Sequence, residues 1–279
     1  MISSEYRQSN AALLQIKNVS KTFSYADSRQ NHTVLNKVSI DIKDGEFVTI
    51  VGPSGCGKST LLNIIAGLED PDSGKILVKG ENKTSTDPGR LVIFQEGALF
   101  PWLTVLENVE FGLKLAGIPK DEQRKAASRF IDMVQLSKFA DSYIYQLSGG
   151  MKQRVAIARA LAIDPDILLM DEPFAALDVQ TRDMLHNELL QIHEATKKTI
   201  LFVTHNINEA LALGTRVIVL SPRLGNIKRE FTVNLPRPRD IDSPEIALIK
   251  RQILKELEED FQFARKGNTI AGAAQQRQI

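Results

Sequence analysis

Three scarce features narrow the class of protein before any motif is considered. The sequence has a single cysteine, Cys56, so no intrachain disulfide can form and a reduced, intracellular setting is expected. It has no run of about eighteen apolar residues, so we expect no membrane span, and any role at a membrane would come through a partner protein. Its net charge is only +1, which argues against a broad surface for binding nucleic acid.

Strand patterns and helical patterns alternate along most of the chain. Between about Thr104 and Ala162 the patterns are helical, with little strand material. We therefore predict an α/β core into which a helical subdomain is inserted. A closing helix is expected over residues 244–265, with a loose tail after it. Short β-branched segments predict strands at residues 13–23, 33–42, 46–51, 75–80, 89–95, 166–172, 199–205 and 216–220, and a hairpin around 221–226.

The segment GPSGCGKS, Gly52 to Ser59, fits the phosphate-loop pattern. It follows the apolar run FVTIV and precedes the helical pattern LLNIIAGL. Its backbone amides would surround phosphate groups, and its glycines permit close approach of the backbone. We expect Lys58 to reach the β and γ phosphates and the Ser59 hydroxyl to hold Mg2+. Because a chance glycine-rich turn would match in roughly 1% of such chains, the segment predicts a nucleotide site.

A second apolar strand, ILLMDE, ends in two carboxylates. The carboxyl end of a buried parallel strand lies at the ligand-binding edge of a sheet. We expect Asp171 to bind Mg2+ there through water, and Glu172 to polarise the attacking water. Apolar strands that end in acids are common, so this prediction depends on the phosphate loop. The adjacent Glu172 also favours hydrolysis over transfer to an acceptor.

Two more polar side chains follow apolar strands. TILFVTH ends in His205, which could bond the γ phosphate and position the water or Glu172. LVIFQ ends in Gln95, whose amide could sense Mg2+ and the attacking water. Taken alone, His205 is as readily a surface or capping residue, and Gln95 is more readily an ordinary polar one. The stronger argument is that both would converge with Lys58 and Asp171 on one edge of the sheet.

The segment LSGGMKQRVAIARAL, residues 147–161, offers a second site for an anion. Ser148 and the backbone amides of Gly149 and Gly150 stand at a predicted helix start, which suits a phosphate. A second phosphate site would be redundant unless it meets the other side of a nucleotide. We therefore predict two copies packed head to tail, each covering the ATP of the other.

Taken in order, the phosphate loop, FQ, LSGGMKQR, LLMDEPFAALD and VTH resemble the ATP-binding subunit of an ABC transporter, from about Leu14 to Leu235. The resemblance implies a P-loop NTPase core of the RecA-like type with an N-terminal antiparallel β subdomain. It places the ATP-binding core at residues 1–95 and 165–240 and the helical subdomain at 96–164. The C-terminal helix and tail then occupy 241–279.

The resemblance also gives roles to the second anion site. It implies that Ser148, Gly149 and Gly150 contact the γ phosphate of the partner's ATP. It implies that Asp178 couples the two sites across the interface. Met151 replaces the usual glutamine of this motif, and we expect activity to survive because the serine and backbone amides do most of the phosphate binding.

An aromatic ring near residue 23 is implied to stack on adenine. Phe23 matches by position, and Tyr25 is the competing candidate. His32, His186 and His193 lack the spacing of metal ligands and receive no role. The predicted nucleotide-binding set is Phe23, Gly52, Pro53, Ser54, Gly55, Cys56, Gly57, Lys58, Ser59, Thr60, Ser148, Gly149, Gly150 and Asp178; the predicted catalytic set is Lys58, Gln95, Glu172 and His205, and the predicted Mg2+ set is Ser59, Gln95 and Asp171.

The segment FQEGALFPWLTVLENV resembles the importer subfamily for nitrate, aliphatic sulfonates, taurine and related small solutes. In that subfamily this neighbourhood receives a short helix from the membrane subunit. Phe100, Pro101 and Trp102 would make a good anchor for such a helix, and they can equally plug the core of the helical subdomain.

The resemblance therefore implies a set of partners and a location. The partners are a second ATP-binding subunit (identical or a paralogue), transmembrane permease subunits and a solute-binding protein, with no nucleic acid. The chain would lie at the cytoplasmic face of the membrane as a peripheral subunit. Two alternatives remain: a soluble ABC-type ATPase that works on DNA or ribosomes, and a P-loop kinase that phosphorylates a small molecule.

Overall fold

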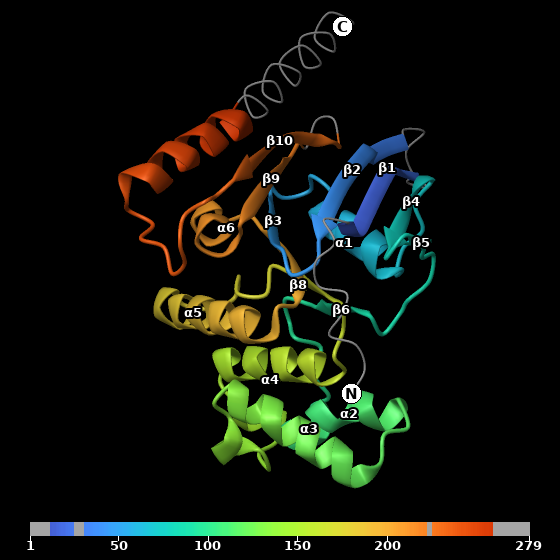
Figure 1. Cartoon of the computed structure of the whole chain (residues 1–279), viewed down its shortest axis with the longest axis vertical. Coiled ribbons are helices and arrows are strands. Elements are labelled where there is room, and N and C mark those ends of the chain that lie inside the picture. The colour runs from blue at the N-terminus through green and yellow to red at the C-terminus, as the bar shows by residue number, and fades with distance from the viewer. Residues whose placement is uncertain (1–11, 25–30, 222–224, 259–279) are drawn as a thin grey trace, which may run out of the picture.

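The computed structural model describes residues 12–24, 31–221 and 225–258. Helices α2, α3 and α4 gather at one end of the molecule, and the strands lie toward the other end (Figure 1). Over the described ranges, no helix combines the length and the apolar character that a bilayer span requires.

The first sheet is antiparallel and is built mainly from the N-terminal part of the chain. Its strand order is β2-β1-β4-β5, with β1 over Ala12–Ser24, β2 over Asn31–Lys43, β4 over Ser73–Val78 and β5 over Glu81–Asn82. Along β2, buried Val38, Ile40 and Ile42 alternate with exposed residues, because only one face of the sheet packs on the core. The predicted N-terminal antiparallel β subdomain is confirmed.

The second sheet has the order β10-β9-β3-β8-β7-β6 and is parallel except for the edge strand β10. Its central strands β3 and β8 are buried along their whole length, as expected for parallel strands covered on both faces. The antiparallel pairing of β9 with β10 confirms the predicted hairpin, although residues 222–224 lie outside the described residues. The strands are β3 (Phe47–Val51), β6 (Arg90–Ile93), β7 (Ile167–Asp171), β8 (Thr199–Thr204), β9 (Arg216–Leu220) and β10 (Ile227–Thr232).

Helix α1, Lys58–Ala66, packs against both sheets. Its buried Leu61 and Ile65 share one apolar cluster with Ile16 of the first sheet and Ile50 of the second. The phosphate loop is therefore held between a strand and a helix that are both anchored in the core.

The helical region consists of α2 (Val105–Leu115), α3 (Lys120–Met133), α4 (Gly149–Ala162) and two short 3-10 turns, Ser137–Phe139 and Ile144–Gln146. Helix α2 starts with a capping box, in which the Thr104 hydroxyl accepts from Glu107 N at 3.2 Å and the Glu107 carboxylate accepts from Thr104 N at 2.8 Å. Buried residues of this region share one apolar cluster with Ile93 and Met170 of the second sheet. Because this packing is continuous, the division of the chain at residues 96 and 164 stays a prediction.

Two further helices and the C-terminal segment cover the second sheet. Helix α5 spans Val179–Thr196 and α6 spans Ile207–Leu213. Residues 244–258 form a helix whose buried Ile246 and Ile253 pack with Leu211 of α6 and Phe231 of β10. The expected continuation to residue 265 and the tail lie outside the described residues.

Candidate active site

The phosphate loop joins the end of β3 at Val51 to the start of α1 at Lys58. Gly57 has a φ of 100°, and a Cβ there would lie 2.8 Å from Val34 Cγ1. A Cβ on Gly52 would lie 2.6 Å from Cys56 Sγ. Both positions therefore require glycine, because a side chain at either one would collide with a neighbouring part of the chain.

Lys58 has only 4% of its surface exposed. Its ammonium donates to the carbonyl oxygens of Gly52 at 2.9 Å and Pro53 at 3.1 Å, and lies 3.8 Å from Glu172 Oε1. Two backbone carbonyl oxygens, which carry only partial negative charge, therefore hold the Lys58 ammonium at the phosphate loop. A phosphate oxygen bearing full negative charge would be a stronger partner for it.

Asp171 ends β7 and accepts a hydrogen bond from Ser59 Oγ at 3.1 Å. Burial raises the pKa of the Asp171 carboxyl, and the hydrogen bond from Ser59 partly offsets that rise. The two side chains present a carboxylate and a hydroxyl oxygen on adjacent elements. These are the hard oxygen donors that Mg2+ prefers, so the two side chains would suit a Mg2+ ion.

Glu172 follows directly and has a φ of 45°, a left-handed backbone that is uncommon for glutamate. Its amide donates to Val203 O at 3.0 Å, which ties it to the neighbouring strand β8. Its carboxylate lies 2.6 Å from His205 Nδ1, whose N–H donates to it. The strained backbone turns the carboxylate toward the end of β8.

Gln95 lies two residues beyond the end of β6, which pairs in parallel with β7. Its side chain is exposed and forms no hydrogen bond with any other described residue. Of the residues expected at this edge, Lys58, Asp171, Glu172 and His205 are therefore brought together with Ser59. Gln95 is placed at the same edge without touching them.

The second predicted anion site lies where helices α4 and α5 begin. Ser148 caps α4, and its hydroxyl accepts from Met151 N at 3.3 Å. A Cβ on Gly150 would lie 2.7 Å from Thr181 Cγ2 at the start of α5. Asp178 caps α5 by accepting from Thr181 N at 3.0 Å, and this hydrogen bond lowers the pKa of the Asp178 carboxyl.

Phe23 lies near the end of β1, opposite His32 on β2. It is half-buried, and the Lys21 ammonium lies 5.4 Å from its ring centroid. Because Val34 of β2 touches the loop at Gly57, this end of the hairpin adjoins the phosphate loop. The competing Tyr25 lies outside the described residues.

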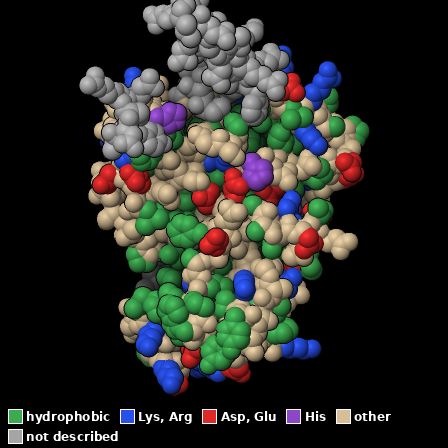
Figure 2. All heavy atoms as spheres, turned by 180° about the vertical axis from the view of Figure 1, so that it is seen from behind, with side chains coloured by type: hydrophobic (Ala, Val, Ile, Leu, Met, Phe, Trp, Pro, Cys, Tyr) green, Lys and Arg blue, Asp and Glu red, His purple; other side chains and the backbone are tan. Residues whose placement is uncertain are grey.

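The two aromatic residues of the segment after Gln95, Phe100 and Trp102, differ in burial. Phe100 is half-buried and packs on Phe111 with ring centroids 4.4 Å apart, whereas Trp102 is 69% exposed. Figure 2, seen from behind, shows apolar side chains gathered at the helical end of the molecule. One aromatic side chain therefore plugs the helical region and its neighbour faces outward.

The profile of the ABC transporter family matches residues 35–175, about half of the chain. The chain belongs to the ABC transporter family. The match spans the phosphate loop, the capped α4 and the acidic end of β7, which are the features described above.

Three similar proteins are import ATP-binding subunits. The nitrate import ATP-binding protein of Synechocystis is 47% identical over 86% of this chain and 89% of its own length. The taurine import ATP-binding protein of Roseobacter denitrificans is 46% identical, covering 78% and 81%. The aliphatic sulfonates import ATP-binding protein of Bacillus cereus is 45% identical, covering 88% and 96%. The predicted ABC subunit and its importer subfamily are confirmed.

Solved structures support the same assignment. A dimeric structure of a bacterial ABC transporter cassette is 38% identical, covers 80% of this chain and 100% of its own, and has a TM-score of 0.70. A second structure of that cassette, in a post-hydrolysis state bound to ADP and Pi, has a TM-score of 0.69. This ABC subunit is accordingly an ATP-binding protein with ATPase activity.

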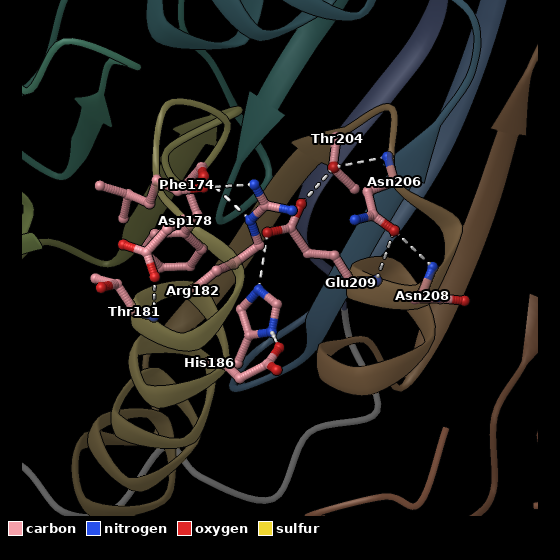
Figure 3. Close-up of polar contacts among 11 residues, drawn as sticks. Phe174, Asp178, Thr181, Arg182, His186, Thr204, Asn206, Asn208 and Glu209 are labelled. Carbon is pink, nitrogen blue, oxygen red and sulfur yellow. Dashed lines mark hydrogen bonds and ion pairs between the residues drawn. The ribbon is translucent and has the colours of Figure 1, made fainter. Parts of the chain in front are cut away.

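Sequence reasoning missed a buried polar network in this ABC subunit (Figure 3). His186 of α5, Glu209 of α6 and Thr204 at the end of β8 are joined by hydrogen bonds. His186 received no role because it lacked metal-ligand spacing. The only sequence signal was its position four residues after Arg182, which places both on one face of α5 just beyond the N-cap Asp178. That spacing does not reveal Glu209 as the partner.

Proposed function

We propose that this chain is one of a pair of ATP-binding subunits that drive uptake of a small solute through membrane permease subunits. The solute class is that of the three relatives: nitrate, taurine, an aliphatic sulfonate or a related compound, delivered by a solute-binding protein. The chain would act at the cytoplasmic face of the membrane. The family match favours this role over the kinase alternative and over an ATPase that works on DNA or ribosomes.

The observation that supports a pair is the separation of two half-sites. Within the described residues, Lys58 and Ser59 bond to Gly52, Pro53, Glu172 and Asp171, whereas Ser148 and Asp178 bond to Met151 and Thr181. Each half-site is nevertheless fully built: the loop encloses Lys58, and Ser148 caps α4 beside the start of α5. A second molecule, turned head to tail, brings the Ser148 half-site to the open side of the nucleotide.

The chemistry proposed for this pair is water attack on the γ phosphate. The loop amides and Lys58 hold the phosphates, and Glu172 accepts a proton from the attacking water. His205 keeps the Glu172 carboxylate in place through their hydrogen bond. Ser59, Asp171 and Gln95 are the residues that would hold Mg2+, which supplies charge neutralisation at the phosphate oxygens when bound. The bond from the γ phosphorus to ADP breaks, and phosphate leaves.

A groove of about 320 Å³ beside the segment after Gln95 is the proposed docking site for the permease. Arg159 of α4 lines this groove and donates to the carbonyl oxygens of Gly97 and Ala98 at 2.8 Å each. These bonds fix the segment after Gln95 to α4. Trp102 and Leu115 are exposed near this groove. Its lining is mostly apolar: Leu91, Val92, Ile93, Ala98, Phe100, Phe111, Gly112, Leu115, Ala156, Arg159, Ala160 and Ile163. An amphipathic helix of a membrane partner fits such a surface.

Growth of a deletion strain tests the solute class. We expect the strain to fail on nitrate as sole nitrogen source, or on taurine or an alkanesulfonate as sole sulfur source. The wild-type chain should restore growth, and the Glu172→Gln variant should not. Replacing exposed Trp102 by serine should reduce both growth and the amount of chain retained in the membrane fraction. Normal growth of the deletion strain on all three sources would show that the proposed solute class is wrong.

A further inference from the structure

A buried polar network connects α5 with the residue that precedes His205 (Figure 3). The Glu209 carboxylate accepts from His186 Nε2 at 2.8 Å through one oxygen. Its other oxygen accepts from the Thr204 hydroxyl. Exposures are 5% for Glu209, 8% for His186 and 1% for Thr204, so the network is closed to solvent.

Thr204 links Glu209 to the backbone next to His205. Its hydroxyl donates to the Glu209 carboxylate, and its oxygen accepts from Asn206 N at 2.9 Å. The Glu209 amide in turn donates to Asn206 Oδ1 at 3.3 Å. These bonds hold the backbone on both sides of His205, which is itself exposed and has Glu172 as its partner.

The same face of α5 holds the segment that follows Glu172. Arg182 donates to the carbonyl oxygens of Phe174 at 3.3 Å and Leu177 at 2.7 Å. The Phe174 ring meets the His186 ring with centroids 5.5 Å apart and planes at 61°. Asp183 Oδ1 also lies 3.9 Å from His186 Nδ1. The first two turns of α5 therefore contact both segments that carry the Glu172–His205 pair.

We propose that His186, Glu209 and Thr204 are positioning residues that hold His205 against Glu172 and link this pair to the Asp178 turn. The proposal rests on the roles given above to Glu172 and His205. A buried carboxylate that loses one of its two donors is left with an unsatisfied charge, so it will rotate or admit water. Either response releases Thr204 and with it the backbone beside His205.

Two substitutions of His186 test the proposal in the full chain. His186→Gln keeps an N–H donor close to the position of Nε2, whereas His186→Leu removes it at similar volume. We expect His186→Leu to lower kcat about tenfold with less than a twofold change in KM for MgATP, and His186→Gln to recover most of the loss.

A matched control comes from the other buried histidine of α5. His193 Nε2 bonds to Gly45 O at 3.1 Å, before the start of β3 and so at the opposite edge of the sheet. His193→Leu should lower stability while kcat per folded molecule stays at the wild-type value. A kcat loss of the same size in His193→Leu and His186→Leu would overturn the proposal.

Thr204 provides a second pair of variants if His186→Leu fails to fold. Thr204→Ser keeps the hydroxyl and should retain kcat, whereas Thr204→Val keeps the shape and should lower kcat about as much as His186→Leu. Equal kcat in the serine and valine variants would contradict the proposal.

A spectroscopic readout separates positioning from general loss of structure. The chain has four histidines, so the ring signals of His205 can be assigned in a nitrogen-15 spectrum. We expect His186→Leu to shift the His205 Nδ1 signal and His193→Leu to leave it unchanged. An unchanged His205 signal in His186→Leu would refute the positioning role. Wild-type kcat in Glu172→Gln would instead refute the catalytic assignment on which it rests.

Discussion

Glu172 Oε2 and His205 Nδ1 lie 2.6 Å apart and join the carboxyl ends of the neighbouring parallel strands β7 and β8. The other oxygen of Glu172 lies 3.8 Å from the Lys58 ammonium. One carboxylate therefore faces both the group that would hold the γ phosphate and the group that fixes its own orientation. This arrangement suits a base whose carboxylate must keep its orientation beside a phosphate until water arrives.

Removing the charge of Glu172 should separate ATP binding from hydrolysis. We expect Glu172→Gln to lower kcat by at least about 100-fold, because the amide cannot accept the proton of water. The binding groups at Lys58 and Ser59 are unchanged, so ATP should still bind and hold two subunits together. ATPase assays and gel filtration with and without ATP check both parts. Hydrolysis at the parental rate would show that Glu172 is not the base.

Two inactive variants should restore activity when they are mixed. Lys58→Ala removes the phosphate-binding cation, and Ser148→Arg blocks the second half-site. In a head-to-tail pair, one site of a mixed dimer combines an intact loop with an intact Ser148. We expect each variant alone to be inactive and an equal mixture to reach up to roughly a quarter of wild-type ATPase activity. Mixed dimers that form without any activity would contradict the shared site.

The close approach of Gly150 to Thr181 should be measurable as a compensating pair. A methyl group on Gly150 would lie 2.7 Å from Thr181 Cγ2, so Gly150→Ala should destabilise the chain by about 1 kcal/mol despite the better helix propensity of alanine. Adding Thr181→Ser deletes the opposing methyl and should restore the loss. Urea unfolding of the single and double variants measures the effect. A double variant no more stable than Gly150→Ala would disprove this contact.

His193 should make the fold sensitive to acid. Burial, with a smaller contribution from the Arg237 charge, lowers the pKa of His193 from 6.5 to about 4. The unfolded chain therefore binds a proton first, so stability is full above pH 6.5 and falls as the pH falls toward 4. From pH 7.5 to pH 5 the loss from this residue should be about 2 kcal/mol.

Comparison with His193→Gln isolates that contribution. Glutamine can keep a donor for Gly45 O, which His193 Nε2 bonds at 3.1 Å, but it does not titrate. Urea unfolding at the two pH values should show a smaller loss of stability in the variant than in the wild type. An equal loss in both proteins would assign the acid sensitivity to other groups.

Much of the site could be predicted because its residues follow local patterns. The apolar run of β3 leads into the phosphate loop, that of β7 ends at Asp171, and that of β8 is followed directly by His205. Parallel strands bring those ends to one side of the sheet. The phosphate-loop pattern placed Lys58, and these strand endings, combined with that loop, placed Asp171 and His205. The helical character of residues 104–162 was visible in the same way, because helical periodicity is also local.

The remaining features depend on contacts between distant residues. The left-handed backbone of Glu172 carries no sequence signal, because glutamate rarely adopts that conformation. The bond between His186 and Glu209 joins the helices that precede and follow β8 in the sequence, so no spacing rule reports it. The contact of Gly150 with Thr181 likewise arises only when α4 meets α5.

The hydrogen bonds of Arg159 couple the 97–102 loop to helix α4. Arg159 belongs to the same helix as Ser148, yet its guanidinium is bonded to the carbonyl oxygens of Gly97 and Ala98, just after Gln95. If residues 97–102 are displaced and α4 does not follow, both hydrogen bonds of Arg159 must break. In the proposed pair, Gln95 would belong to the pocket of its own subunit and Ser148 to that of the neighbour, so a single movement at the loop would reach both nucleotides at once.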